Sequence, residues 1–252
     1  MSNTANNKDL EFTLSRLKKQ NERFLNRFFK LNVQGLTMLD FGSGMGGLSF
    51  ELVQRGAKYV VGVDLNMRRM QFARKALEEV YPEMKSHVRF VHGRLDQVSE
   101  EEAFDAIISK ATVEHLFDIP SVLDEFARLL KPGGSVLLGF GPLYHSPWGD
   151  HFRMRRNHIP WSHLFLPEKY WFRQIHRRRG AVIRNKKDLG LNGLSFSAYQ
   201  HIFYNHPKFW VQDFRTNVSD QSYNFIFKFF SKIPLLKKYF IHNIYCELIR
   251  KP

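Results

Sequence analysis

The sequence predicts a doubly wound α/β fold, in which a mostly parallel sheet of seven strands has helices on both faces. The first observation is that short apolar runs alternate with helical segments of about 10 to 16 residues between residues 36 and 141, a pattern typical of βαβ units. The second is that two further strand-like runs follow near the C-terminus, in 209–218 and 242–251. Because such crossovers are right-handed, the helices cover both faces of the sheet.

The elements between residues 36 and 141 follow from apolar runs and their stop signals. The expected strands cover residues 36–40, 58–64, 87–93, 104–110 and 135–140. The expected helices cover residues 8–30, 48–56, 67–82 and 120–134. Gly56, Pro82 and the Pro-Gly-Gly run at 132–134 supply stop signals, because these residue types end helices.

The alternation ends at Gly141. Residues 142–193 are rich in proline and histidine and have no regular period, so we expect an insert there without regular elements. A helix followed by a strand is expected over 195–218, and a helical or broken-helical piece over 223–240. We expect one domain of four parts: an N-terminal helical cap (1–35), a ligand-binding core (36–141), the insert (142–193) and a C-terminal part (194–252).

Composition limits the possible functions. Of the 252 residues 43% are hydrophobic, which is enough for a sizeable core, and the single cysteine excludes a disulfide framework and a metal site built from cysteines. The polar N-terminus and the absence of a long apolar run predict neither a secretory signal nor a membrane span, so we expect a cytoplasmic protein. The net charge of +14 predicts an anionic partner, either nucleic acid, a lipid surface or a phosphorylated substrate.

Four glycines follow the first expected strand and its terminal Asp40, namely Gly42, Gly44, Gly46 and Gly47. A glycine-rich turn lets a ligand approach the main chain, and the next helix adds N–H groups and a partial positive charge. A dinucleotide places its pyrophosphate there, and S-adenosylmethionine places its methionine end and ribose there. Asp40 favours S-adenosylmethionine, because its carboxylate can accept a hydrogen bond from an ammonium group and would repel a pyrophosphate.

Asp64 ends the second expected strand, 24 residues after Asp40. A carboxylate at that position suits the hydroxyls of a ribose. The alternative is an ordinary N-cap for the helix expected to start near residue 67. Since ligands of open α/β sheets bind beyond the carboxyl ends of the strands, we expect Asp40, Asp64, Gly93 and Lys110 to face one crevice.

Five segments resemble, in order and spacing, the motifs of the class I S-adenosylmethionine-dependent methyltransferases, most closely the small-molecule branch. The segments are LDFGSGMGGLSF, VVGVDL, VRFVHGRLDQV, FDAIISKATVEHL and LDEFARLLKPGGSVLLGF. The resemblance covers residues 36–141 strongly and the C-terminal strands less specifically. It implies a Rossmann-like methyltransferase fold with a lid insertion after the fifth strand. It also implies S-adenosyl-L-methionine as cofactor and S-adenosyl-L-homocysteine as product.

The resemblance also implies which residues contact the cofactor: Asp40, Gly42, Ser43, Gly44, Gly46, Asp64, Leu65, Leu95, Asp96, Ser109 and Lys110. The glycine loop would hold the methionine end, and Asp64 and Leu65 the ribose and the adenine. Arg94 stands where the family often has the acid that reads the adenine amino group, so Asp96 would replace it from two residues further on. His115 would lie near the transferred methyl group, or serve only as a structural residue.

The insert is where this fold usually builds a lid over the acceptor, and its histidines are candidates for a general base. His145 and His151 lie in a segment rich in aromatic residues, and a histidine titrates near neutral pH. Residues 150–190 hold eleven Arg or Lys and three Asp or Glu. Arg153, Arg155 and Arg156 would hold an anionic group of the acceptor, although a solvated basic face is the alternative. No spacing matches a zinc signature, so we predict no metal.

These observations predict an S-adenosylmethionine-dependent enzyme that methylates a hydroxyl or amine of a small molecule or a sugar or glycan precursor. The acceptor is expected to carry phosphate or to be lipid-linked, since the chain is basic. Weak association with nucleic acid or an anionic membrane surface is expected through the basic insert. The alternatives are an RNA methyltransferase, a non-catalytic partner subunit that keeps the fold, and a dehydrogenase.

Overall fold

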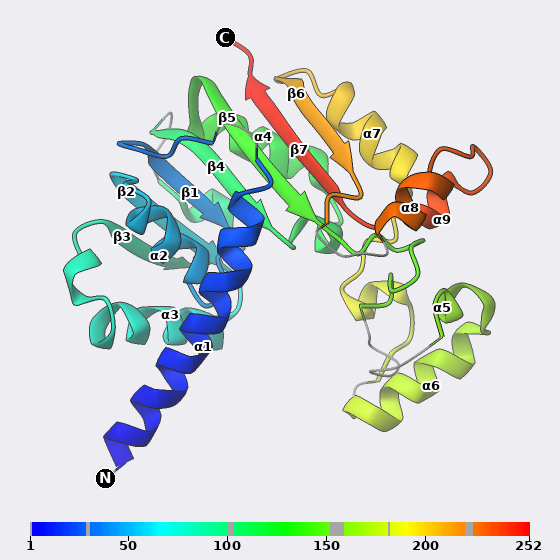
Figure 1. Cartoon of the computed structure of the whole chain (residues 1–252), viewed down its shortest axis with the longest axis horizontal. Helices are drawn as coiled ribbons and strands as arrows, with labels where there is room; N and C mark the ends of the chain where they lie inside the picture. Colours follow the sequence, from blue (N-terminus) through cyan, green and yellow to red (C-terminus); the bar gives the residue numbers. More distant parts are fainter. Residues whose placement is uncertain (1, 29–30, 100–102, 152–158, 181, 220–223) are drawn as a thin grey trace.

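A computed structural model describes residues 2–28, 31–99, 103–151, 159–180, 182–219 and 224–252. Its seven-stranded sheet has the order β3-β2-β1-β4-β5-β7-β6 (Figure 1). The strands are β1 (Thr37–Phe41), β2 (Tyr59–Asp64), β3 (Val88–His92), β4 (Phe104–Lys110), β5 (Leu130–Phe140), β6 (Phe209–Thr216) and β7 (Ile244–Arg250). Strands β1 to β5 pair in parallel, and β7 runs antiparallel to both β5 and β6. The predicted mostly parallel sheet is therefore confirmed.

Helices cover both faces of this sheet (Figure 1). The α-helices are α1 (Ser2–Leu25), α2 (Gly47–Gln54), α3 (Met67–Glu79), α4 (Ile119–Leu129), α5 (Ser162–Phe165), α6 (Glu168–Arg179), α7 (Phe196–Tyr204), α8 (Asn224–Phe230) and α9 (Lys237–Phe240). Short 3-10 turns are η1 (Pro82–Met84), η2 (Leu95–Gln97), η3 (Val113–His115) and η4 (Lys186–Leu189). One core cluster joins the sheet to α4 and α7, and a second joins it to α1 and α2. The doubly wound prediction is confirmed.

Two predicted elements differ from the structure. The helix expected over 120–134 ends at Leu129, and strand β5 already begins at Leu130. The cause is Pro132, which lacks an N–H and pushes the preceding residue into extended backbone. The expectation that the insert lacks regular elements is also wrong, because it contains α5 and α6.

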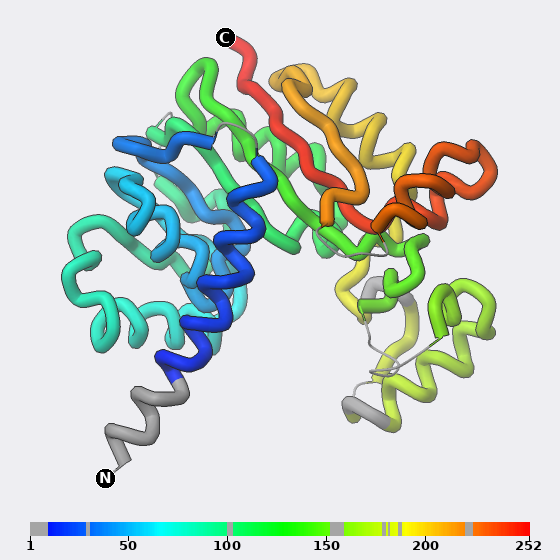
Figure 2. The backbone as a smooth tube through the Cα atoms, viewed as in Figure 1, coloured from blue at the N-terminus to red at the C-terminus, as the bar shows by residue number. Residues whose placement is uncertain are grey.

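Helix α6 forms because one side of it is apolar. The many charged residues of the segment obscure this side in the sequence. Trp171 and Ile175 lie one turn apart, are almost completely buried, and pack with Tyr144, Leu189 and Leu191. This small cluster stands apart from the main core, and Figure 2 shows the insert extending away from the sheet beyond the carboxyl end of β5. The role of the insert as a lid stays a prediction.

Candidate functional site

A cavity of about 440 Å³ opens at the carboxyl ends of β1, β2 and β4. Its wall includes residues of α1, of the glycine loop after β1 and of the turn after β4. The lining residues are Leu17, Gln20, Asn21, Asp40, Gly42, Ser43, Gly44, Met45, Gly47, Leu48, Asp64, Arg69, Lys110, Ala111, Thr112 and His115. This volume falls in the range of small-molecule pockets, and the position is where open α/β sheets bind ligands. The cavity brings together Asp40, Asp64 and Lys110 as predicted, whereas Gly93 does not line it.

The glycine loop is fixed by main-chain hydrogen bonds from the N–H groups of Gly42 and Ser43 to the carbonyl oxygen of Val63 (2.8 and 3.0 Å). Gly44 has a left-handed φ of +56°, and a Cβ placed on it would find no heavy atom nearer than 3.9 Å. The space beside its main chain is thus open to a ligand, as the sequence predicts. Gly46 differs, because a Cβ there would lie 2.6 Å from the ring of Phe90. Gly46 serves packing and does not line the cavity.

Gly47 lets helix α1 pass close over the glycine loop. A Cβ at Gly47 would lie 2.9 Å from the Cβ of Leu17. Further along α1, the amide oxygen of the buried Asn21 accepts a hydrogen bond from the ammonium group of Lys110 (2.6 Å). Helix α1 therefore forms one wall of the cavity, and Figure 1 shows it crossing the face of the sheet next to α2.

Asp64 connects the end of β2 to the glycine loop. One carboxylate oxygen accepts a hydrogen bond from the N–H of Gly44 (2.9 Å), and the other accepts one from the N–H of Asn66 (2.7 Å). The N-cap of α3 is Asn66, whose side chain accepts from the N–H of Arg69. The helix-cap alternative for Asp64 is therefore wrong. Each carboxylate oxygen has a second lone pair, so Asp64 can also accept from ligand hydroxyls.

Asp40 and Lys110 are the buried charges of the cavity. Asp40 is 1% exposed, and one of its oxygens accepts a hydrogen bond from the hydroxyl of Ser49 (2.7 Å). Burial raises the pKa of Asp40 to about 7, although the Ser49 hydroxyl and the charge of Lys110 lower it in part. Burial also lowers the pKa of Lys110 to about 8. A cationic group bound beside Asp40 would stabilise the ionised carboxylate.

Four other predicted cofactor contacts do not line the cavity. Leu65 is 71% exposed, and Leu95 is buried in the main core. Asp96 is largely exposed and lies 3.6 Å from Arg94. Ser109 is buried, and its hydroxyl donates to the carbonyl oxygen of Phe41. Contact of these four residues with the cofactor stays a prediction.

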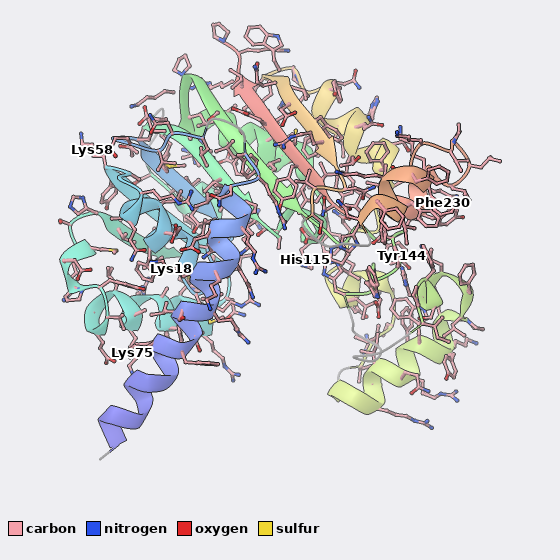
Figure 3. The ribbon with its side chains drawn as sticks, viewed as in Figure 1. Lys18, Lys58, Lys75, His115, Tyr144 and Phe230 are labelled. Atoms are coloured by element: carbon pink, nitrogen blue, oxygen red, sulfur yellow. The ribbon has the colours of Figure 1, made fainter. Side chains whose placement is uncertain are left out.

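His115 lies at the edge of the cavity, on the side that faces the insert (Figure 3). Its ring centroid is 5.2 Å from that of His151, so the structure brings two of the three predicted catalytic histidines together. Nδ1 of His115 contacts the carbonyl oxygen of Gly190, and Nε2 of His151 contacts that of Pro142. Because a carbonyl only accepts, these nitrogens carry the protons, and in the neutral ring the opposite nitrogen holds the lone pair.

Glu114 lies next to this pair of histidines and is 3% exposed. One of its oxygens accepts a hydrogen bond from the N–H of Gly141 (3.2 Å). Ligand atoms of Glu114, His115 and His151 lie within 4.8 Å of one another, and within the described ranges this is the group with a geometry that could hold a metal ion. Alternatively, the carboxylate would stabilise an imidazolium that forms when either histidine takes up a proton. That the protein uses no metal stays a prediction.

The third predicted histidine, His145, lies apart from this pair. Its ring packs edge-on against Tyr144 at 5.4 Å between centroids, and it lines neither of the cavities described here. Arg153, Arg155 and Arg156, predicted to hold an acceptor anion, fall outside the described residues.

A second cavity, of about 370 Å³, adjoins the first and shares Gln20, Lys110 and Ala111 with it. It lies between α1 and the carboxyl end of β5. Its lining residues are Gln20, Arg23, Phe24, Arg27, Lys110, Ala111, Gly139, Phe140, Gly141, Ser219, His242, Asn243 and Tyr245. Arg23, Arg27 and Lys110 are cationic, and none of the described lining residues is acidic. Burial lowers the pKa of His242 to about 4, so this histidine is neutral.

Sequence reasoning missed Gln20, Asn21, Arg69 and Thr112, which line the first cavity. Gln20 and Asn21 interrupt the apolar spacing of α1, but that spacing alone does not show which polar residues face the sheet. Thr112 could have been found, because it follows directly after Lys110 and Ala111 at the end of β4.

The comparisons with known proteins agree with this geometry. The sequence model of the family described as methyltransferase domain matches residues 39–138 of the chain. The chain is 26% identical over 136 residues to a mitochondrial ubiquinone biosynthesis O-methyltransferase of Dictyostelium discoideum, covering 51% of this chain and 42% of the relative. It is 37% identical over 111 residues to phosphoethanolamine N-methyltransferase 1 of Zea mays, covering 43% of this chain and 21% of the relative.

A solved S-adenosylmethionine-dependent methyltransferase from Mesorhizobium loti has the same fold. It superposes with a TM-score of 0.59 at 16% identity and covers 90% of this chain and 95% of its own. The chain spans less than half the length of the two curated relatives above, and the matches lie over the cofactor-binding part. The family match over residues 39–138, the sheet order and the glycine loop joined to Asp64 together support a class I S-adenosylmethionine-dependent methyltransferase domain in this part of the chain.

Proposed function

We propose that the chain transfers a methyl group from S-adenosylmethionine to a hydroxyl or amine of an anionic small molecule. The observation that carries this proposal is the junction of two cavities at Lys110 and Ala111. The first has the features of a cofactor site, and the second opens beside it with a cationic lining. Two adjoining cavities of this kind suit a bimolecular transfer, in which donor and acceptor must be held in contact.

The first cavity fits the cofactor on four structural grounds. The open main chain at Gly44 admits a ligand, and Asp64 presents a fixed carboxylate for ribose hydroxyls. Asp40 supplies a buried acceptor for the methionine ammonium, and Lys110 is a cation for a carboxylate. A dinucleotide fits less well, because its pyrophosphate would lie against Asp40.

Bound S-adenosylmethionine supplies an electrophilic methyl carbon, so the chain mainly aligns the acceptor and excludes water. His115 lines the first cavity, and the ring of His151 lies 5.2 Å from that of His115, so this pair would take up the acceptor proton. With their carbonyl partners fixing the tautomers, Nε2 of His115 and Nδ1 of His151 are candidate bases. The neighbouring carboxylate of Glu114 would stabilise the resulting imidazolium.

An anionic acceptor is supported by the charges of the second cavity. Arg23, Arg27 and Lys110 contribute three positive charges, and the guanidinium of Arg27 is held in place by the hydroxyl of Tyr245 (2.8 Å). A sulfonium nearby would add a further positive charge. Such a site favours a phosphate or carboxylate, since charge-assisted hydrogen bonds are stronger than neutral ones.

The acceptor is identified by measuring the release of S-adenosylhomocysteine with matched probes. 3,4-Dihydroxybenzoate and catechol compare an anionic with a neutral hydroxyl acceptor, and phosphoethanolamine tests an amine, as suggested by the names of the relatives. We expect turnover of anionic probes and little of the neutral one. Faster methylation of purified RNA than of every small acceptor would support the RNA alternative, which the net charge of +14 favours.

Arg23→Gln is expected to raise the KM of the anionic acceptor about tenfold with kcat nearly unchanged, because it removes one charged contact that forms before reaction. Steady-state kinetics measure both constants. The matched control is Arg16→Gln, an exposed arginine of the same helix that lines neither cavity. An equal KM change in both variants would contradict a specific anion contact.

Binding of S-adenosylhomocysteine is expected to weaken as the pH falls through 7. The pKa of Asp40 is raised to about 7, so the carboxylate is ionised above that pH and neutral below it. An ammonium ligand prefers the ionised form, and the dissociation constant should rise by up to about tenfold per pH unit below 7. Calorimetric titration between about pH 7.5 and about pH 5.5 measures it. Asp40→Asn should bind weakly with a flat profile, and an unchanged slope in this variant would exclude Asp40 as the cause.

A further inference from the structure

The segment between β6 and β7 exposes large apolar side chains. On α8, the side chains of Phe225 and Phe229 are 69% and 61% exposed, and Ile226 is partly exposed. The turn to α9 exposes Leu235 at 85%. Monomeric soluble proteins seldom gather so many large apolar groups on one short segment without a partner.

Helix α8, which carries most of these exposed side chains, packs against the rest of the protein on its other side. Phe227, on the opposite side of α8, is buried, and its ring packs against those of Phe240 and Trp148. Phe230 packs against Phe240 at 4.8 Å between centroids. The apolar outer side of α8 is therefore a face of a packed element.

The insert extends this face. The indole of Trp161 packs against Phe240 at 5.2 Å and donates a hydrogen bond to the carbonyl oxygen of Tyr239. This contact joins the residue before α5 to the C-terminal end of α9. On either side of the contact, Ile159 and Phe165 are 77% and 76% exposed. We use the name α8–α9 face for the exposed apolar side chains of these segments, which are Ile159, Phe165, Phe225, Ile226, Phe229, Ile233 and Leu235.

The charge of the segment that carries α8 and α9 has one sign. Residues 221–246 contain four lysines and no acidic residue. The four, Lys228, Lys232, Lys237 and Lys238, are all exposed. Exposed aromatic and aliphatic groups next to lysines are the combination by which interfacial helices bind anionic bilayers.

We propose that the α8–α9 face docks on an anionic lipid bilayer. The apolar side chains would enter the headgroup and acyl boundary, and the lysines would contact lipid phosphates. Among the described residues no helix has the length and apolar content to cross a bilayer, and the proposed contact lies in the interface. The sequence placed a membrane contact in the basic insert, whereas the structure favours the β6–β7 segment together with the Ile159 and Phe165 side chains.

The location of the bilayer contact affects how an acceptor would reach the second cavity. Ser219 precedes α8, and His242 and Asn243 lie two and three residues after the end of α9. All three line the second cavity. A bilayer at the α8–α9 face would therefore lie next to the proposed acceptor cavity. The docking itself does not depend on the proposed methyl transfer, because lipid binding is measured without cofactor or acceptor.

Co-sedimentation with vesicles tests the proposal. We expect the protein to bind vesicles of phosphatidylcholine mixed with phosphatidylglycerol, to bind phosphatidylcholine alone weakly, and to dissociate as salt is raised. The double variant Phe225→Ser with Phe229→Ser should lower the partition coefficient about tenfold or more. Lys228→Gln with Lys232→Gln should weaken binding only to the anionic vesicles, by about tenfold.

Matched controls lie elsewhere on the chain. Phe12→Ser removes a phenylalanine of α1 that is 72% exposed, and Lys75→Gln removes a lysine of α3. Both should bind vesicles like the unmodified protein. Leu235→Ser serves as a second probe if the double variant loses its thermal transition. No binding to anionic vesicles, or equal losses in test and control variants, would overturn the proposal. A dimer that dissociates in the double variant, without vesicle binding, would instead make this face a contact between two copies.

Discussion

Replacing His151 or His115 with alanine is expected to lower kcat at least about a hundredfold, because a positioned general base contributes roughly 10² to 10⁴ in rate. The ring centroids lie 5.2 Å apart, His115 lines the first cavity, and both rings are oriented by main-chain carbonyls. Turnover is measured as release of S-adenosylhomocysteine with the best acceptor of the screen. Cofactor affinity should stay intact, since neither imidazole is expected to hold the methionine or ribose groups.

His145→Ala is the comparison variant. The sequence ranked His145 with His151, but in the structure His151 lies beside His115, whereas the ring of His145 packs against that of Tyr144. We expect its kcat to change only a few-fold. If His115→Ala and His151→Ala also keep near-normal turnover, then no base is needed and alignment alone accounts for the rate. Restoration of activity in either variant by added imidazole would identify proton transfer as the lost step.

Asp64→Ala is expected to weaken the binding of S-adenosylhomocysteine by about 1.5 to 3 kcal/mol, the scale of lost charge-assisted hydrogen bonds. Two effects contribute, because the carboxylate would accept from the ribose and also holds the N–H groups of Gly44 and Asn66. Calorimetry at pH above 7 measures the affinity, where Asp40 is ionised.

Asp64→Asn separates the two effects. Its amide oxygen can still accept one of the two main-chain hydrogen bonds, but it lacks the charge and one acceptor. We expect an intermediate affinity with thermal stability closer to that of the unmodified protein. An unchanged affinity in Asp64→Ala would refute the ribose assignment. Tight binding of a nicotinamide dinucleotide without binding of S-adenosylhomocysteine would refute the cofactor itself.

The parallel core could be predicted because its signals are local. Each strand is a short apolar run ended by a turn signal, and the crossover rule then brings Asp40, Asp64 and Lys110 to one edge. The glycine pattern predicted an open main chain, which the structure has at Gly44. It could not separate the glycine that faces the cavity from Gly46, which is required by Phe90 of a strand more than 40 residues away.

The features that the sequence did not predict depend on contacts between residues distant in sequence. Helix α6 is specified by Trp171 and Ile175 packing on Tyr144 and Leu191, and no local period shows that partnership among so many arginines. The second cavity is lined by residues of α1, β5 and β7. Its lining therefore cannot be predicted from the sequence before the relative positions of these elements are known. The same holds for the approach of His115 to His151, which come from opposite sides of β5 in the chain.

Helix α1 contributes residues to both cavities, and this has a thermodynamic consequence for ligand binding. Gln20 belongs to both linings, and Asn21 ties the helix to Lys110 at their junction. A ligand in either cavity that holds α1 in place spares the other ligand the cost of ordering it. Donor and acceptor should then bind cooperatively, and each must raise the affinity of the other by the same factor. One helix would in this way make the ternary complex more stable than the two separate affinities predict.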